Sequence, residues 1–245
     1  MTTPERLWRQ FNKALGQYQL IDEDDRILVG LSGGKDSLCL VELLARRSRI
    51  LRPHFTVEAI HVRMENIRYE TDSDYLRDFC SSQGVPLHIV TTRFEPAPPP
   101  RAEGADTRPG KSKPACFLCS WQRRKQLFDL AQRRGCAKIA LGHHQDDIIL
   151  TALMNLTFQG HFSTMPARLS MRKMPLTIIR PLCLCREEDI RQYAELRQYR
   201  KLTKLCPYET ATNRTSVRQL LGQMEHLNPE ARHSLWNAIE SANLL

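Results

Sequence analysis

The sequence lacks any hydrophobic run of the roughly 20 apolar residues that a membrane-spanning helix requires. It also lacks the apolar core of a signal peptide, because residues 1–15 carry charged side chains at Glu5, Arg6, Arg9 and Lys13. We therefore expect a cytoplasmic protein without a membrane segment.

Acidic residues are outnumbered, with 27 Asp and Glu against 36 Lys and Arg and a net charge of +9. This excess favours an anionic partner such as nucleic acid, although a basic surface can also serve solubility alone. The eight cysteines argue against a disulfide framework, because the cytosol keeps thiols reduced. Metal ligation or burial must explain them, and we assign Cys39, Cys80 and Cys136 to packing because their surroundings are apolar.

Short β-rich runs alternate with helical patterns along the chain. Strands are predicted at 26–31, 56–62, 87–91, 138–141 and 177–181, and helices follow at 38–44, 72–83, 121–134, 146–158 and 187–198. This alternation predicts an α/β fold with a doubly wound parallel sheet. We expect an N-terminal helical extension at 1–25, the α/β domain at 26–205 and a C-terminal helical tail at 206–245.

The segment 94–115 is rich in proline and basic residues and cannot form a packed core. It is long for a connection within a compact domain, so it is either a disordered linker or a mobile substrate-binding loop. We favour the mobile loop because it leads directly into a pair of cysteines, and its basic side chains would hold nucleic-acid phosphates.

A glycine-rich hexamer, Ser32-Gly33-Gly34-Lys35-Asp36-Ser37, joins the first predicted strand to the first helix of the sheet. Two glycines let the backbone approach an anion closely, and the free N–H groups of the helix start then face it. The hydroxyls and the lysine add donors and charge, while Asp36 can hold the helix start or Mg²⁺. An ordinary strand-to-helix turn needs only one glycine. The Walker A spacing is absent, so this is a different phosphate loop.

A second polar motif, Gly142-His143-His144-Gln145-Asp146-Asp147, lies where another predicted strand ends. Ligands of open α/β sheets bind outside the carboxyl ends of the strands, so this motif should face the phosphate loop. Its two carboxylates could bind magnesium or act in acid–base steps. The alternative is that Asp146 and Asp147 only favour the helix dipole at its N-terminus.

Two thiols, Cys116 and Cys119, lie three residues apart at the start of a predicted helix and can reach one metal. Cys183 and Cys185 follow a strand, where alternation would point them to opposite faces, so joint ligation is not expected. Cys206, in a proline-marked loop, is the better third ligand. Three thiolates fit either an iron–sulfur cluster with one open iron or a zinc site completed by histidine.

In their order along the chain, these motifs resemble those of the tRNA 2-thiocytidine synthetase family of PP-loop ATP pyrophosphatases. The resemblance rests on SGGKDS, CFLC followed by the basic residues 123–125, GHHQDD, Ile179-Arg180-Pro181-Leu182 and Cys206. It implies the adenine nucleotide alpha-hydrolase (PP-loop) type of doubly wound sheet with helical terminal additions. It also implies a [4Fe-4S] cluster on Cys116, Cys119 and Cys206.

By the same resemblance, ATP and Mg²⁺ are expected in the crevice between the two polar motifs. The nucleotide-binding residues would be Leu31, Ser32, Gly33, Gly34, Lys35, Asp36, Ser37, Gly142 and Asp147. Asp36, Arg123 and Asp147 are the expected catalytic residues, Arg123 because related thiolases carry a basic catalytic residue there.

The implied reaction is ATP-dependent thiolation of a tRNA pyrimidine, with 2-thiocytidine as the product. The expected partners are tRNA and a persulfide sulfur donor such as a cysteine desulfurase, and a homodimer is left open. One alternative is another PP-loop ligating or amidating enzyme, such as a lysidine synthetase, which would need no cysteines. A second is a metal-containing RNA-binding module without catalysis, against which the intact phosphate loop argues.

Overall fold

A computed structural model describes residues 1–69, 73–95, 114–206 and 213–245. The main sheet has the strand order β4-β2-β1-β5-β7-β6, and every neighbouring pair is parallel except β6 with β7. The strand bounds are β1 Asp25–Gly30, β2 Phe55–Met64, β4 Leu87–Thr92, β5 Lys138–Ala140, β6 Arg168–Ser170 and β7 Thr177–Ile179. The predicted doubly wound α/β fold is therefore confirmed, with an antiparallel edge strand added.

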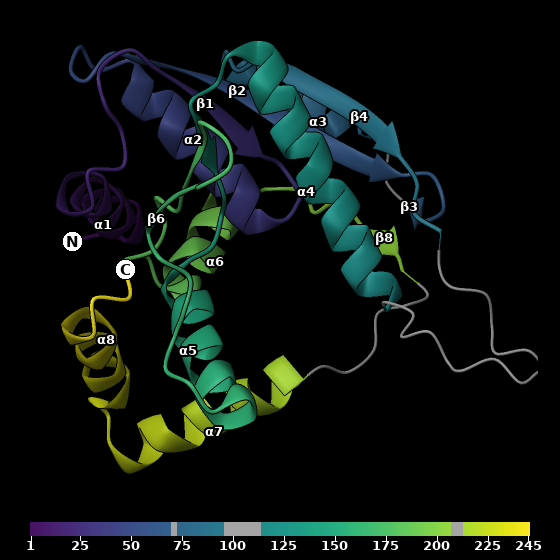
Figure 1. Ribbon diagram of the computed structural model, residues 1–245. Helices are drawn as coiled ribbons and strands as arrows, with labels where there is room; N and C mark the ends of the chain where they lie inside the picture. The colour runs from purple at the N-terminus through teal and green to yellow at the C-terminus, as the bar shows by residue number, and fades with distance from the viewer. Residues whose placement is uncertain (70–72, 96–113, 207–212) are drawn as a thin grey trace, which may run out of the picture.

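Helices cover both faces of this sheet (Figure 1). Their bounds are α1 Thr3–Gln17, α2 Lys35–Ser48, α3 Asp74–Ser82, α4 Ala115–Arg134, α5 Gln145–Gln159, α6 Glu187–Leu196, α7 Asn213–Leu227 and α8 Ala231–Ser241. A small separate ribbon pairs β3, Arg68–Tyr69, with β8, Lys204–Leu205.

Alternating side chains of β1 supply two separate hydrophobic clusters. Ile27 and Val29 belong to the larger cluster, together with side chains of α1, α2, α3, α5 and α6, whereas Leu28 belongs to a smaller cluster with Leu130 and Ala131 of α4. A strand that is buried on both faces reads as an uninterrupted apolar run, which is how Ile27 to Val29 appears in the sequence. The helix α4 therefore covers one face of the sheet by itself near its centre.

The order of the strands places the two polar motifs together. From β1 the chain continues to β2, its neighbour on one side, whereas β5 pairs with β1 on the other side. The connections after β1 and after β5 therefore leave the sheet at adjacent carboxyl ends, where open α/β sheets bind ligands. The phosphate loop follows β1, and the motif at 142–147 follows β5.

Some expectations from the sequence need correction. The helix α4 begins at Ala115 rather than at residue 121, so Cys116 and Cys119 lie within its first turns. Cys183 and Cys185 do not alternate along a strand, because β7 ends at Ile179 and both thiols are buried in a turn within the larger cluster. Burial raises the pKa of both thiols, which keeps them protonated as packing groups.

Other expectations are outside what can be compared. Residues 96–113 of the predicted mobile loop lie outside the described residues. The division of the chain into an extension at 1–25, a domain at 26–205 and a tail at 206–245 stays a prediction. Both terminal segments do contain helices, α1 in the first and α7 and α8 in the last. The short strands β3, β6 and β8 have too few residues to show periodicity. Across the described ranges, every helix is too short or too polar to span a membrane.

A buried carboxylate fixes the segment that follows α6 against α2. Glu42 accepts hydrogen bonds from the hydroxyls of Tyr193, at 2.9 Å, and Tyr199, at 2.5 Å, and forms an ion pair with Arg197 at 2.8 Å. The carboxylate side chain is only 10% exposed. Leu202, three residues beyond Tyr199, donates its N–H to the Gly33 carbonyl of the phosphate loop. The Glu42 network therefore holds in place the segment that packs on this loop.

We predict that Glu42→Gln lowers the free energy of unfolding by about 1–3 kcal/mol, because an amide cannot accept from three donors and adds a buried donor of its own. The matched control is Glu195→Gln, which removes an exposed ion pair with Arg191 and should cost less than about 1 kcal/mol. Urea denaturation measures both changes. Equal losses in the two variants would contradict this account of Glu42.

Candidate functional site

The phosphate loop is a tight turn that is closed by its own hydroxyls. The Oγ atoms of Ser32 and Ser37 lie 3.1 Å apart, and Ser37 Oγ accepts from the Ser32 N–H at 3.2 Å. Ser37 Oγ also donates to the Gly34 carbonyl at 2.9 Å. Gly34 then provides the N-cap of α2 without a side chain. The first N–H groups of α2 therefore open toward the crevice, as an anion site requires.

Gly33 is required by its backbone and by its neighbour. Its φ angle is +85°, and a Cβ atom built there would lie 2.5 Å from the Cβ of Leu202. The N–H of Leu202 donates to the Gly33 carbonyl at 3.0 Å. The segment between α6 and β8 therefore packs directly on the loop, which only glycine permits.

The motif at 142–147 packs against the phosphate loop, as the sequence predicts. A Cβ on Gly142 would lie 3.1 Å from the backbone carbon of Asp36 and 3.2 Å from the Ser37 nitrogen. His144 is buried, and its backbone N–H donates to Asp147 Oδ2 at 3.0 Å. The loop that leads into α5 therefore packs tightly against the first turn of α2, and a Cβ at Gly142 would crowd this backbone.

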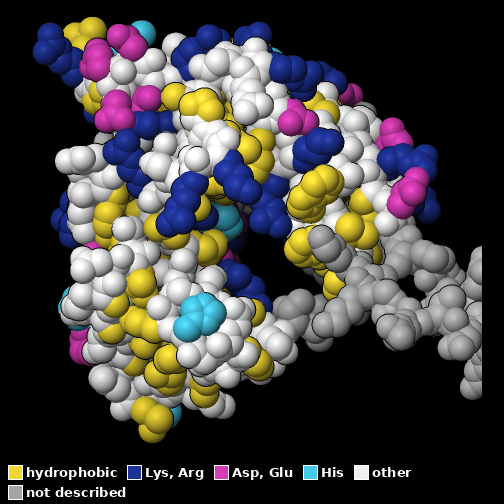
Figure 2. Space-filling model, viewed as in Figure 1, with side chains coloured by type: hydrophobic (Ala, Val, Ile, Leu, Met, Phe, Trp, Pro, Cys, Tyr) yellow, Lys and Arg dark blue, Asp and Glu magenta, His cyan; other side chains and the backbone are white. Residues whose placement is uncertain are grey.

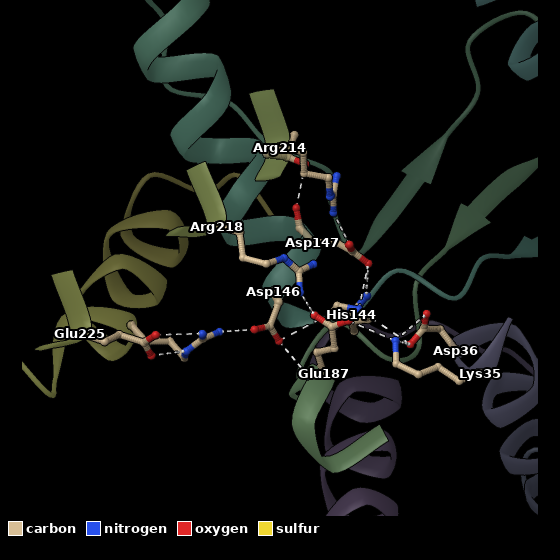
Figure 3. A network of polar contacts seen from close by, with 11 residues as sticks. Lys35, Asp36, His144, Asp146, Asp147, Glu187, Arg214, Arg218 and Glu225 are labelled. Atoms are coloured by element: carbon tan, nitrogen blue, oxygen red, sulfur yellow. Dashed lines mark hydrogen bonds and ion pairs between the residues drawn. The ribbon is translucent and has the colours of Figure 1, made fainter. Parts of the chain in front are cut away.

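Acidic and basic side chains form a continuous network over these two helix starts (Figure 3). His144 Nε2 lies 3.8 Å from Asp36 Oδ1 and 3.5 Å from Asp147 Oδ2. Lys35 Nζ lies 2.9 Å from Asp36 and 3.1 Å from Glu187 of α6. Burial opposes the charge of Lys35, but these two carboxylates outweigh burial and raise its pKa. Lys35 is therefore a fixed cation at the loop.

The C-terminal helices contribute arginines to the same network. Arg214 of α7 pairs with Asp147, and Arg218 of α7 pairs with Glu187. Arg232 of α8 pairs with Asp146 at 2.5 Å, and Asp146 also accepts from the Glu187 N–H at 2.8 Å. Asp146 therefore joins helices together, whereas Asp147 faces the phosphate loop.

His143, which is partly buried, and Arg180, which is buried, form a pair beside the network. Arg180 Nε donates to His143 Nδ1 at 3.3 Å, and its other end donates to the Pro166 carbonyl at 2.5 Å. Burial, together with the charge of Arg180, lowers the pKa of His143 to about 4. His143 is therefore a neutral acceptor at pH 7, which is the state that this hydrogen bond requires.

A cavity of about 300 Å³ connects the phosphate loop with α4. Its lining residues are Ser32, Gly34, Tyr69, Arg123, Lys201, Leu202 and Thr203. Arg123 donates to the Tyr69 hydroxyl at 3.1 Å, and Cys119 lies one helical turn before it in α4. Burial acts to lower the pKa of Arg123, but these contacts outweigh it and raise the pKa. The cavity therefore has the phosphate loop on one side and the guanidinium of Arg123 on the other.

The structure brings the predicted cysteine ligands into one region. Cys119 and Cys206 pack on the same hydrophobic cluster as Tyr69, and β8 lies beside the start of α4 (Figure 1). Cys116 is exposed in the first turn of α4, and none of these three cysteines forms a disulfide. Among the described residues, no three Cys, His, Asp or Glu side chains are close enough together to hold a metal ion. Their joint ligation of a cluster stays a prediction.

Sequence reasoning missed several members of the site. Glu187, Arg214 and Arg218 lie on helices that the sequence predicts, but nothing in a charged helix shows which neighbour each charge will meet. His61 is buried and hydrogen-bonded through Nδ1 to the Leu31 carbonyl at 2.8 Å. The sequence could have indicated this residue, because it is a polar side chain within the apolar run of β2.

A phosphate loop and a second polar motif at the switch point of a parallel sheet define a nucleotide-binding α/β protein. The sequence model of the PP-loop domain family matches residues 4–225. Curated relatives include the tRNA-cytidine(32) 2-sulfurtransferase of Shewanella amazonensis, which is 33% identical over 97% of this chain and 72% of that protein. The tRNA-cytidine(32) 2-sulfurtransferase of Bordetella avium is 35% identical over 96% of this chain and 72% of that protein. The chain belongs to the PP-loop domain family and, within it, to the tRNA-cytidine(32) 2-sulfurtransferase family.

A solved structure gives the same assignment of the fold. The U34-tRNA thiolase NcsA from Methanococcus maripaludis, determined with its [4Fe-4S] cluster, superposes with a TM-score of 0.74 at 25% sequence identity. The match covers 98% of this chain and 78% of that one. The resemblance found in the motifs is thereby confirmed, whereas the roles of the individual site residues stay predictions.

We predict that Gly33→Ala lowers the free energy of unfolding by at least about 1 kcal/mol, because alanine is strained at this positive φ angle and would clash with Leu202. Gly16→Ala is the matched control, since a Cβ there meets nothing within 4 Å and α1 should tolerate or favour it. Thermal or urea unfolding measures both. Equal stability of the two variants would show that the loop does not need glycine.

We predict that the protein loses stability as the pH falls from about 6.5 to about 4. The unfolded chain protonates His143 near pH 6.5, whereas the folded protein does so only near pH 4. In that window the unfolded state binds more protons, so this residue alone lowers the free energy of unfolding by at most about 1.4 kcal/mol per pH unit. His143→Gln keeps an acceptor for Arg180 and should flatten the decline. An unchanged slope would contradict the assignment.

Proposed function

We propose that this protein catalyses the ATP-dependent 2-thiolation of a tRNA cytidine, at position 32 as the names of its relatives indicate. The observation that carries the proposal is the cavity between the phosphate loop and Arg123. It has a predicted triphosphate site on one wall and, through Arg123, a predicted sulfur site on the other. A base placed there would face both halves of the reaction.

The first half of the reaction activates the base. The O2 atom of cytidine would attack the α-phosphate of ATP, forming an O–P bond and releasing pyrophosphate. The N–H groups at the start of α2, with Lys35, would bind the phosphates, and Asp36 and Asp147 would hold Mg²⁺. Carboxylate oxygens are the type of ligand that suits Mg²⁺.

The second half replaces oxygen by sulfur. Sulfur at the oxidation level of sulfide would attack C2, and the C2–O bond would break with AMP as the leaving group. A [4Fe-4S] cluster on Cys116, Cys119 and Cys206 would leave one iron open to carry that sulfur. A persulfide donor with a two-electron reductant such as a thiol would supply it. Arg123, between Cys119 and the cavity, would stabilise the negative charge that develops on the departing phosphate oxygen.

Basic side chains near the cavity fit a tRNA partner. Arg124 and Lys125 are exposed on α4, next to Arg123, and Lys201 lines the cavity itself. Figure 2 shows Lys and Arg side chains around a hollow on this face of the molecule. A target base that leaves its stack could enter the cavity while the backbone phosphates stay on the basic rim.

The proposal predicts that tRNA from cells without this protein lacks 2-thiocytidine, and that the wild-type gene restores it. Mass spectrometry of tRNA nucleosides measures the modified base directly. Undiminished 2-thiocytidine in the deletion strain would contradict the proposed reaction.

Cys206→Ala should abolish thiolation and the visible absorption of anaerobically purified protein, because one cluster ligand is lost. The matched control is Cys136→Ala, which removes a thiol that is buried in the small cluster and should keep both properties. Full thiolation by the Cys206 variant would remove the cluster from the mechanism.

Asp36→Asn should lose tRNA-dependent pyrophosphate release while it keeps the visible absorption, since only the nucleotide site changes. Asp74→Asn, in the first turn of α3 and 73% exposed, is the control and should turn over normally. Unaltered pyrophosphate release by the Asp36 variant would show that the nucleotide site is assigned wrongly.

A further inference from the structure

Two carboxylates near the phosphate loop, Asp147 and Glu187, are held by basic side chains from distant parts of the chain. Asp147 pairs with Arg214, while Glu187 pairs with both Arg218 and Lys35. The two arginines come from α7, which lies outside the sheet and packs on α5 (Figure 1). Asp147, which is expected to hold Mg²⁺, is thus already neutralised by Arg214. The role of Arg214 at this position needs an explanation.

Contacts other than the Arg214 ion pair also hold the C-terminal helices in place. Val217 and Leu221 of α7 are buried in the main cluster. The adjoining α8 is joined to α5 by Arg232, whose side chain is 16% exposed and pairs with both Asp146 and Glu225. Arg214 is 37% exposed, more than twice as much as Arg232. The better-buried pair can fix the C-terminal helices, which leaves Arg214 available for another role.

The position of Arg214 links it to the phosphate loop. Asp147, its partner, accepts from the His144 backbone, and His144 Nε2 lies 3.8 Å from Asp36 Oδ1. The α2 backbone at Asp36 is in contact with Gly142, at the start of the same motif. Figure 3 shows Arg214 and Arg218 on the same side of Asp147 and Glu187, approaching the two helix starts. Arg214 is therefore a cation that is connected, through Asp147 and His144, to the first turn of α2 after the phosphate loop.

We propose that Arg214 is a phosphate-binding residue for ATP, and that its ion pair with Asp147 holds it in place until the nucleotide arrives. This inference rests on the proposed function. When Mg²⁺ binds Asp147, the metal replaces the arginine as the partner of the carboxylate, and the guanidinium turns to a phosphate oxygen. Such an exchange keeps every charge paired, which a partly buried site requires. A guanidinium also matches phosphate oxygens in a bidentate manner.

The test is the affinity of the full-length protein for α,β-methylene-ATP with Mg²⁺, measured by calorimetry. Arg214→Gln should weaken this affinity about 10- to 100-fold, the factor for losing one charge-assisted hydrogen bond. The affinity for adenosine, measured by competition, should stay within about twofold because adenosine has no phosphate. Arg214→Lys should recover part of the loss, since it restores the charge without the bidentate geometry.

Arg191→Gln is the matched control, because Arg191 makes only exposed ion pairs with Glu188 and Glu195 on α6. It should bind the analogue as the wild-type protein does. Equal affinity of Arg214→Gln and the wild-type protein would overturn the inference, and so would an equal loss for adenosine. Unfolding of both Arg214 variants would also overturn it, by making Arg214 a docking residue. A wild-type protein that binds no analogue would instead refute the proposed function.

Discussion

The site depends on the close approach of two helix starts at a tight backbone contact made by a glycine. Gly142 lies against the backbone of Asp36 and Ser37, so the first turns of α2 and α5 share one crevice. Both helices begin where adjacent parallel strands end, and their free N–H groups and acidic residues therefore converge. A side chain at Gly142 would crowd the backbone of Asp36 and Ser37 and press the two helix starts apart.

The charges around this crevice are balanced in pairs rather than left free. Lys35 joins Asp36 to Glu187, and Asp147 is held by Arg214. Pairing is the expected state of partly buried charges, because an isolated ion would be costly to desolvate. It also means that a bound nucleotide must compete for partners that already exist. The affinity for ATP is then a difference between two sets of ion pairs, and helices outside the sheet contribute to it.

The cavity with Arg123 connects the two ends of the proposed chemistry. Tyr69, on the small ribbon of β3 and β8, accepts from Arg123, and Cys206 follows β8 directly. The same ribbon is preceded by Leu202, which packs on Gly33. A short stretch of chain therefore runs from the phosphate loop to the predicted third cysteine. This continuity would let the predicted nucleotide and sulfur sites lie close together although their residues are distant in sequence.

The sequence alone determined the alternation of strands and helices, the glycine loop, the polar motif at 142–147 and the family, because these depend on local patterns with a fixed spacing. It could not reveal that α4 begins at Ala115, or that Cys183 and Cys185 lie in a buried turn. Only the tertiary structure decided which side chains meet: Arg214 with Asp147, Arg218 with Glu187, and Arg123 with Tyr69. Long charged side chains carry no local signal of their partner, because contacts between distant segments depend on how the helices pack around the sheet.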